Sequence, residues 1–72
     1  MKIQYFPETD SLYIDLSENE SVESQELSNG IVADYDKDGN IVGIDIDNAA
    51  KHINLSNLET YSLPLKDIKM SA

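Results

Sequence analysis

The residues best suited to chemistry in this sequence are aspartates spaced two positions apart. Asp34, Asp36 and Asp38 alternate along the chain, Gly39 follows, and Asp45 is the twelfth residue counted from Asp34. This order matches the calcium loop of an EF-hand, where carboxylates at the first, third, fifth and last positions converge on a hard cation and a glycine permits a sharp bend. These four aspartates are therefore the candidate metal ligands.

The neighbouring segments favour a different role for the aspartates. An EF-hand loop joins two helices, whereas this one lies between two stretches rich in β-branched residues, Ile31–Tyr35 and Ile41–Ile46, which predict strands. The break between them is typical of a β-hairpin turn, with Gly39 at positive φ and Asp38 hydrogen-bonded to its own backbone. We favour turn aspartates, keep calcium or another hard cation as the alternative, and predict no cofactor.

Other polar residues give weaker indications of catalysis. His52 is the single histidine, and no cysteine accompanies it, so we interpret it as a surface or packing residue. Two pairs of neighbouring carboxylates have the composition of an acid and base pair: Glu8 with Asp10, and Asp45 with Asp47. A chain of 72 residues has little wall with which to desolvate such groups and shift their pKa values. The sequence therefore predicts a protein that is not an enzyme.

Short antiparallel strands are expected to position these residues. Segments 2–5 and 12–16 predict a first hairpin around a turn at Pro7, and 31–35 with 41–46 predict a second. The polar stretch 17–28 fits either an edge strand near 21–26, blunted by glutamates, or a mobile loop. The fold class we expect is β-rich α+β: an antiparallel sheet of four or five strands in one domain, followed by a short helix and a C-terminal arm.

A short helix of two turns or fewer and a second, separate turn of helix are predicted after the sheet. Asp47 and Asn48 are good N-cap residues for a short helix ending near Ile53. The Ser-x-x-Glu spacing from Ser56 to Glu59 is that of a capping box and predicts a second, brief turn. Beyond this turn, residues 61–65 are expected to be extended. Because Pro64 cannot donate a backbone hydrogen bond, the segment is expected either at the edge of a sheet or in an arm that lies on a neighbouring molecule.

Association is the function that these elements favour. Apolar residues occupy both faces of the second hairpin, which therefore needs cover from a helix or a second subunit. The arm, residues 54–72, is too short to form a core alone. Its Leu63, Leu65 and Ile68 are candidate contacts between subunits, and Tyr13 and Tyr35 are candidate contact residues on the sheet.

Size and charge limit the possible partners. A chain of 72 residues without cysteine supplies a net stability of only about 3–5 kcal/mol, so we expect a homodimer. The net charge of −9, with lysines scattered and no arginine, opposes nucleic-acid binding and suits a basic protein partner. No apolar run approaches the roughly 18 residues of a membrane span and no signal peptide is evident, so we expect a cytoplasmic protein.

From residue 1 to about 53, the chain resembles a family of small prokaryotic proteins known as domain of unknown function 2283. The likeness rests on the following residues: Ile3, Tyr5, Pro7-Glu8, Asp10, Leu12-Tyr13-Ile14, Leu16, Gly30-Ile31, Asp34-Tyr35-Asp36, Asp38-Gly39, Ile41-Val42-Gly43-Ile44, Ile46, Ala49 and Lys51. Phe6 and Asp45 depart from the aspartate and glutamate usual there. The resemblance implies a small β-rich domain without established activity, and it allows an antitoxin-like inhibitor of a basic partner.

Overall fold

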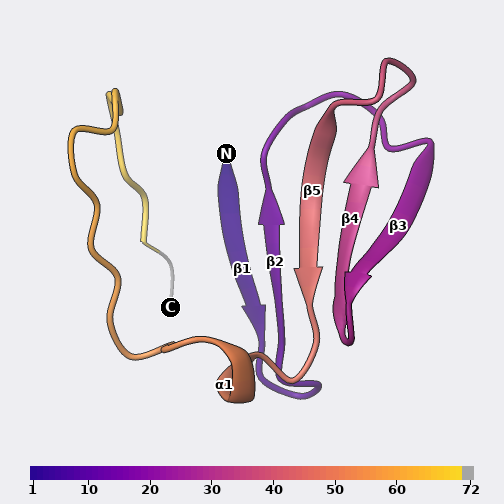
Figure 1. The fold of residues 1–72 in the computed structure, drawn as a ribbon. Coiled ribbons are helices and arrows are strands. Elements are labelled where there is room, and N and C mark those ends of the chain that lie inside the picture. Colours follow the sequence, from indigo (N-terminus) through magenta and orange to yellow (C-terminus); the bar gives the residue numbers. More distant parts are fainter. Residues whose placement is uncertain (71–72) are drawn as a thin grey trace.

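Five short strands form a single twisted antiparallel sheet in the computed structural model, which describes residues 1–70 (Figure 1). The elements are β1 (Lys2–Phe6), β2 (Ser11–Asp15), β3 (Glu23–Ser28), β4 (Ile31–Tyr35), β5 (Ile41–Ile46) and the helix α1 (Ala49–His52). Their order across the sheet is β1-β2-β5-β4-β3. The predicted fold class is confirmed, with five strands in the sheet.

The sheet contains three hairpins, one more than expected. The polar stretch before β4 forms the edge strand β3, which pairs with β4 with a register shift between Glu26 and Ser28. The β1–β2 hairpin joins this meander through β2 and β5, where Ile14 lies opposite Ile44. Pairing with β4 thus gives the glutamate-rich stretch its strand conformation, although its own composition is poor in β-formers.

One face of the sheet collects the aliphatic side chains and is here called the apolar face. Its first cross-strand row is Tyr5, Leu12, Ile46 and Ile31, and its second row is Ile3, Ile14, Ile44 and Ala33. Leu16, whose amide donates to the Val42 carbonyl at 2.9 Å, continues the face beyond these rows. Alternation along each strand places the polar partners on the opposite face.

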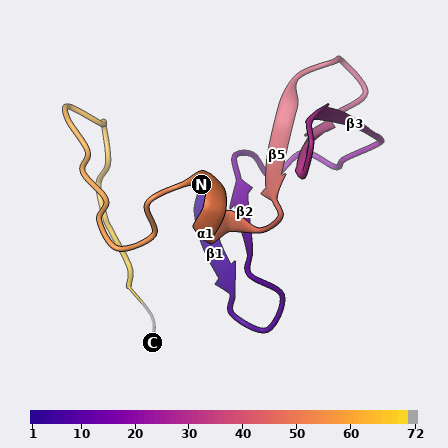
Figure 2. The same cartoon turned by 60° about the horizontal axis from the view of Figure 1, so that its bottom comes forward.

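The helix α1 covers only one end of the apolar face. Ala49 is fully buried against Leu12 and Ile46, with Ile53 packed beside them. The helix is one turn long, within the two turns or fewer expected over 47–53, and Asn48, with a left-handed backbone at φ of 52°, and Ile53 occupy its N-cap and C-cap positions. The remaining rows of the sheet have no second layer above them within the described residues (Figure 2).

The cap of α1 comes from a distant turn, which corrects the expected capping by Asp47 and Asn48. Asn48 makes no side-chain cap hydrogen bond. Instead, the Ala50 amide donates to the Asp10 carboxylate at 3.2 and 3.3 Å, and the Ala49 amide donates to the Asp10 carbonyl at 2.9 Å. Tyr5 also donates its hydroxyl to Asp10 at 2.8 Å. The β1–β2 turn therefore holds the helix on the sheet.

The C-terminal arm, described here for residues 54–70, is irregular. The predicted turn of helix at 56–59 is wrong, because the side chain of Asn54 instead accepts hydrogen bonds from the amide and hydroxyl of Ser56, at 3.0 and 2.6 Å. The expected extended stretch 61–65 is bent: Ser62 has φ of 57°, and the Leu65 amide donates to the Leu63 carbonyl around Pro64. The last two residues of the predicted arm lie outside the described residues.

Candidate functional site

The polar face of the sheet is organised by a tyrosine that crosses a strand. Tyr13 on β2 extends over β5 and donates its hydroxyl to the Asp34 carboxylate on β4 at 2.8 Å. Ser24 on β3 donates to the other oxygen of Asp34 at 2.6 Å. The crossing passes over Gly43, where an added Cβ would overlap the Tyr13 hydroxyl and lie 2.7 Å from its Cζ. Three strands, β2, β3 and β4, are thus joined through one carboxylate, and Gly43 on β5 makes room for the contact.

This arrangement shifts the titration of two groups. The hydrogen bond to Asp34, together with burial and the charge of that carboxylate, raises the pKa of Tyr13 to about 12. Burial raises the pKa of Asp45 on the same face, and the charges of Asp47 and Asp34 add to the effect. Tyr13 is therefore a neutral donor at physiological pH.

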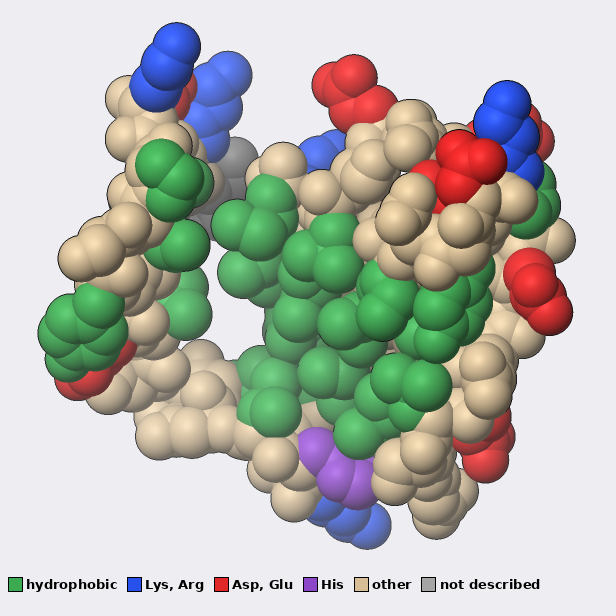
Figure 3. All heavy atoms as spheres, turned by 45° about the horizontal axis from the view of Figure 1, so that its top comes forward, with side chains coloured by type: hydrophobic (Ala, Val, Ile, Leu, Met, Phe, Trp, Pro, Cys, Tyr) green, Lys and Arg blue, Asp and Glu red, His purple; other side chains and the backbone are tan. Residues whose placement is uncertain are grey.

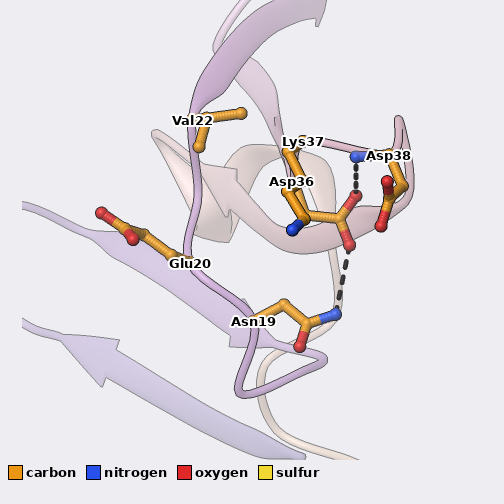
Figure 4. A pocket seen from close by; sticks show the side chains of 6 residues that line it. All are labelled: Asn19, Glu20, Val22, Asp36, Lys37 and Asp38. Atoms are coloured by element: carbon orange, nitrogen blue, oxygen red, sulfur yellow. Dashed lines mark hydrogen bonds between the residues drawn. The ribbon is translucent and has the colours of Figure 1, made fainter.

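Asp36 holds the β4–β5 turn together. The backbone amide of Asp38 donates to its Oδ1 at 2.9 Å, and Asn19 donates its side-chain amide to Oδ2 at 3.2 Å (Figure 4). The backbone amide of Asn40 also donates to Oδ1 at 2.9 Å. These bonds, led by the one from the Asn40 amide, lower the pKa of Asp36. The sequence predicts this role for Asp38, and that prediction is wrong. Asp36 has it because it precedes the turn, where an aspartate can accept from amides two and four residues ahead.

A hollow of about 320 Å³ lies beside this turn (Figure 4). Its lining consists of Asn19, Glu20, Val22, Asp36, Lys37 and Asp38. The carboxylate of Asp36 is buried and already accepts hydrogen bonds from the turn and from Asn19. The hollow therefore lies against a turn whose polar groups are already hydrogen-bonded. Through Asn19, the same turn anchors the connection between β2 and β3.

The four candidate metal ligands are distributed over different parts of the hairpin. Asp34 accepts hydroxyl hydrogen bonds on the polar face, Asp36 is turned into the loop, and Asp45 lies on the adjacent strand opposite Tyr13. Within residues 1–70, no three His, Cys, Asp or Glu side chains are grouped in a way that could hold a metal ion. Calcium binding at the turn stays a sequence-based prediction, for which a calcium-dependent, chelator-sensitive rise in melting temperature is the test.

The remaining polar residues considered for catalysis lie in turns, at the helix or beside neighbouring strands. Asp10 caps α1, while Glu8 is exposed in the β1–β2 turn. His52 is exposed on α1, near the β3–β4 turn at Gly30. Asp47 accepts a hydrogen bond of 3.4 Å from the Ser11 hydroxyl. Sequence reasoning missed both the Asp10 cap and the Tyr13 crossing, since each depends on pairing between strands that are distant in the chain.

The most extensive unpartnered feature is the apolar face itself. Figure 3 shows hydrophobic side chains gathered over the sheet, with the C-terminal arm standing apart from them. Ile3 is 50% exposed and Leu16 is 38% exposed on this face. A single-layer sheet with one short helix leaves these side chains in water, and such patches mark interaction sites in folded proteins.

The predicted interaction residues fall into two groups. Tyr13 and Tyr35 are half-buried, and the hydroxyl of Tyr13 is bound to Asp34. Leu63, Leu65 and Ile68 are exposed on the arm. The structure thus brings the arm leucines to the surface without placing them against the sheet of the same chain.

The fold and these sites define a class of small β-rich domain: a five-stranded antiparallel sheet with a polar face held by a tyrosine and an apolar face left open. The chain belongs to the family described as "Protein of unknown function (DUF2283)", whose model matches residues 2–49. The matched region contains all five strands and the start of α1, and the arm lies beyond it.

No curated protein and no solved structure matched the chain. Along residues 1–70, no helix is long and apolar enough to cross a membrane.

Proposed function

We propose that this protein acts without catalysis, by protein–protein association, and that its first partner is a second copy of itself. The observation that carries the proposal is the open apolar face, where Ile3 and Leu16 are exposed and Ile14 and Ile44 are only partly buried. A chain this small gains little net stability from its own core. Burying the open face against another copy supplies the missing apolar contact.

The polar sites support a non-catalytic role. The carboxylates of Asp10, Asp34 and Asp36 all accept hydrogen bonds that hold strands, turns or the helix in place. The hydroxyl of Tyr13 is bound in the same way. In this proposal the protein works in the cytoplasm of a prokaryote as a small acidic homodimer.

The solution mass of the full chain tests the proposal. Light scattering over a hundredfold range of concentration is expected to give twice the 8.0 kDa of one chain at the upper end, with dissociation on dilution. A mass of 8.0 kDa at every concentration would remove self-association as the function. Double-glutamine replacement of Phe6 and Ile41, which are exposed and alternate onto the opposite face of the sheet, is the matched control and should leave the mass unchanged.

A basic protein is the alternative partner, and the net charge of −9 favours it. In that case the chain would act as an antitoxin-like inhibitor of a small basic protein. Association would then weaken steeply between low and physiological salt, because opposite charges on exposed surfaces are screened within about 8 Å at 0.15 M. Self-association through the apolar face would instead persist at high salt.

A further inference from the structure

We propose that the C-terminal arm of each copy lies across the open apolar face of the other, so that the dimer is held by exchanged arms. This inference rests on the proposed self-association and names its contact surfaces. Both surfaces are unpartnered in the single chain: Leu58, Tyr61 and Ile68 on the arm are 75%, 80% and 67% exposed. The opposing surface is the part of the apolar face beyond α1, centred on Ile3 and Leu16.

The start of the arm directs it away from its own sheet. After α1, the Asn54 side chain closes a turn by accepting from the amide and hydroxyl of Ser56. The chain then runs beyond the β1 edge, and the views in Figures 1 and 2 agree that it stands clear of the strands. Among the described residues, the side-chain hydrogen bonds of the arm join one arm residue to another. They are the two bonds from Ser56 to Asn54 and the bond from Tyr61 to Glu59. An arm held in this direction is placed to reach a neighbour.

The area of the sheet face indicates why the arms are needed. Strands of five or six residues, at about 3.3 Å per residue and about 4.8 Å apart, give a face of roughly 400 Å². A stable interface buries about 800 Å² per partner. Since α1 already covers one end, only part of this flat area is open to a second copy. The arm adds five large apolar side chains: Leu58, Tyr61, Leu63, Leu65 and Ile68.

Charge favours the arm over a second sheet as the covering element. Residues 1–53 carry twelve acidic side chains and three lysines, and so have a net charge of −9. Two such domains carry the same sign of charge, so bringing one sheet against the other is opposed by repulsion, most strongly at low salt. Residues 54–72 carry two acidic residues with Lys66 and Lys69, and so are neutral. Contact between the arm and the sheet therefore avoids that repulsion.

The first test uses two full-length variants with complementary defects. The face variant carries Ile3→Gln and Leu16→Gln and keeps its arm. The arm variant carries Leu63→Gln, Leu65→Gln and Ile68→Gln and keeps its face. All five side chains are exposed, so circular dichroism should show the fold retained. Each variant alone should be monomeric at concentrations where the wild type is dimeric, and an equal mixture should yield a heterodimer in native mass spectrometry.

The possible results separate this inference from the proposed function. An arm variant that remains dimeric would overturn arm exchange while leaving self-association in place. Monomeric variants that form no heterodimer on mixing would also overturn it, because arm and face would not be complementary surfaces. A wild-type chain that is monomeric throughout would remove both the proposed function and the exchange.

A second measurement does not depend on losing the dimer. Because the chain has no cysteine, Leu16→Cys combined with Leu63→Cys places one thiol on each proposed surface. Mild oxidation of this full-length chain is expected to give a covalent dimer on a non-reducing gel. A fast-migrating monomer with an internal disulfide would show instead that the arm folds back onto its own sheet, which would overturn the exchange. Ile41→Cys, which is exposed on the opposite face of the sheet, combined with Leu63→Cys is the control and should cross-link poorly.

Discussion

Replacing Gly43 with alanine tests whether the Tyr13 crossing determines the identity of that position. In a strand without such a contact, replacing glycine with alanine raises the free energy of unfolding by about 0.5–1 kcal/mol, because glycine loses more backbone entropy on folding. Here the new Cβ would overlap the Tyr13 hydroxyl and lie 2.7 Å from its Cζ. The ring must therefore move, and its hydrogen bond to Asp34 is strained or broken.

The expected cost follows from these contacts. Overpacking of this kind costs about 1–3 kcal/mol, and a hydrogen bond to a charged acceptor contributes about 1.5–3 kcal/mol. The two costs overlap, because moving the ring relieves the first while incurring the second. After subtraction of the entropic gain, we expect Gly43→Ala to lower the free energy of unfolding by about 2 kcal/mol. That is a large part of the stability available to a domain of this size.

A double-mutant cycle isolates the cause. In a Tyr13→Ala background the crossing ring is absent, so Gly43→Ala should become neutral or stabilising. Urea unfolding followed by circular dichroism, at one fixed chain concentration, measures all four proteins. A Tyr35→Ala background is the control, in which Gly43→Ala should still destabilise. If Gly43→Ala cost the same with and without Tyr13, the crossing would not be the reason for glycine at this position.

Three further predictions concern pH and charge. The pKa of Tyr13 is raised to about 12 from 10.0, so the stability it contributes is present below pH 10 and is lost as pH rises toward 12; Tyr13→Phe should flatten this part of a urea-unfolding pH series, and an unchanged slope would contradict the Asp34 bond. The pKa of Asp36 is lowered by the Asn40 amide, so its contribution is present above the ordinary carboxyl pKa and is lost as pH falls through the lowered value. Asp36→Asn should therefore lower the melting temperature at pH 7 and weaken its acid dependence, whereas an equally stable variant would show that the charge is unimportant to the turn. The pKa of Asp45 is raised by burial and by the charges of Asp47 and Asp34, so its ionised form is disfavoured at neutral pH. Asp45→Asn should raise the melting temperature at pH 7, with a gain that shrinks as pH falls, and a loss of stability would refute the assignment.

Local patterns in the sequence were sufficient to predict most of the elements. Alternation of apolar residues predicted β2, β4 and β5 within a residue of their observed bounds. The turn at Gly39 was recognisable because few other residues adopt the positive φ of 84° found there. Local patterns failed where partners are distant or absent. The Ser56–Glu59 capping box formed no helix, since it has no packed face to stabilise it.

The sequence by itself determined the fold class, the acidity, the family resemblance and an apolar surplus that one short helix does not cover. Only the tertiary structure decided what the polar residues do. The order β1-β2-β5-β4-β3 places Tyr13 across Gly43 from Asp34, twenty-one residues along the chain, and sets Asp10 beneath α1. These pairings depend on long-range strand register, which alternation of side chains does not specify. For the same physical reason, the aspartates that resemble a calcium loop in sequence are separated once the hairpin forms.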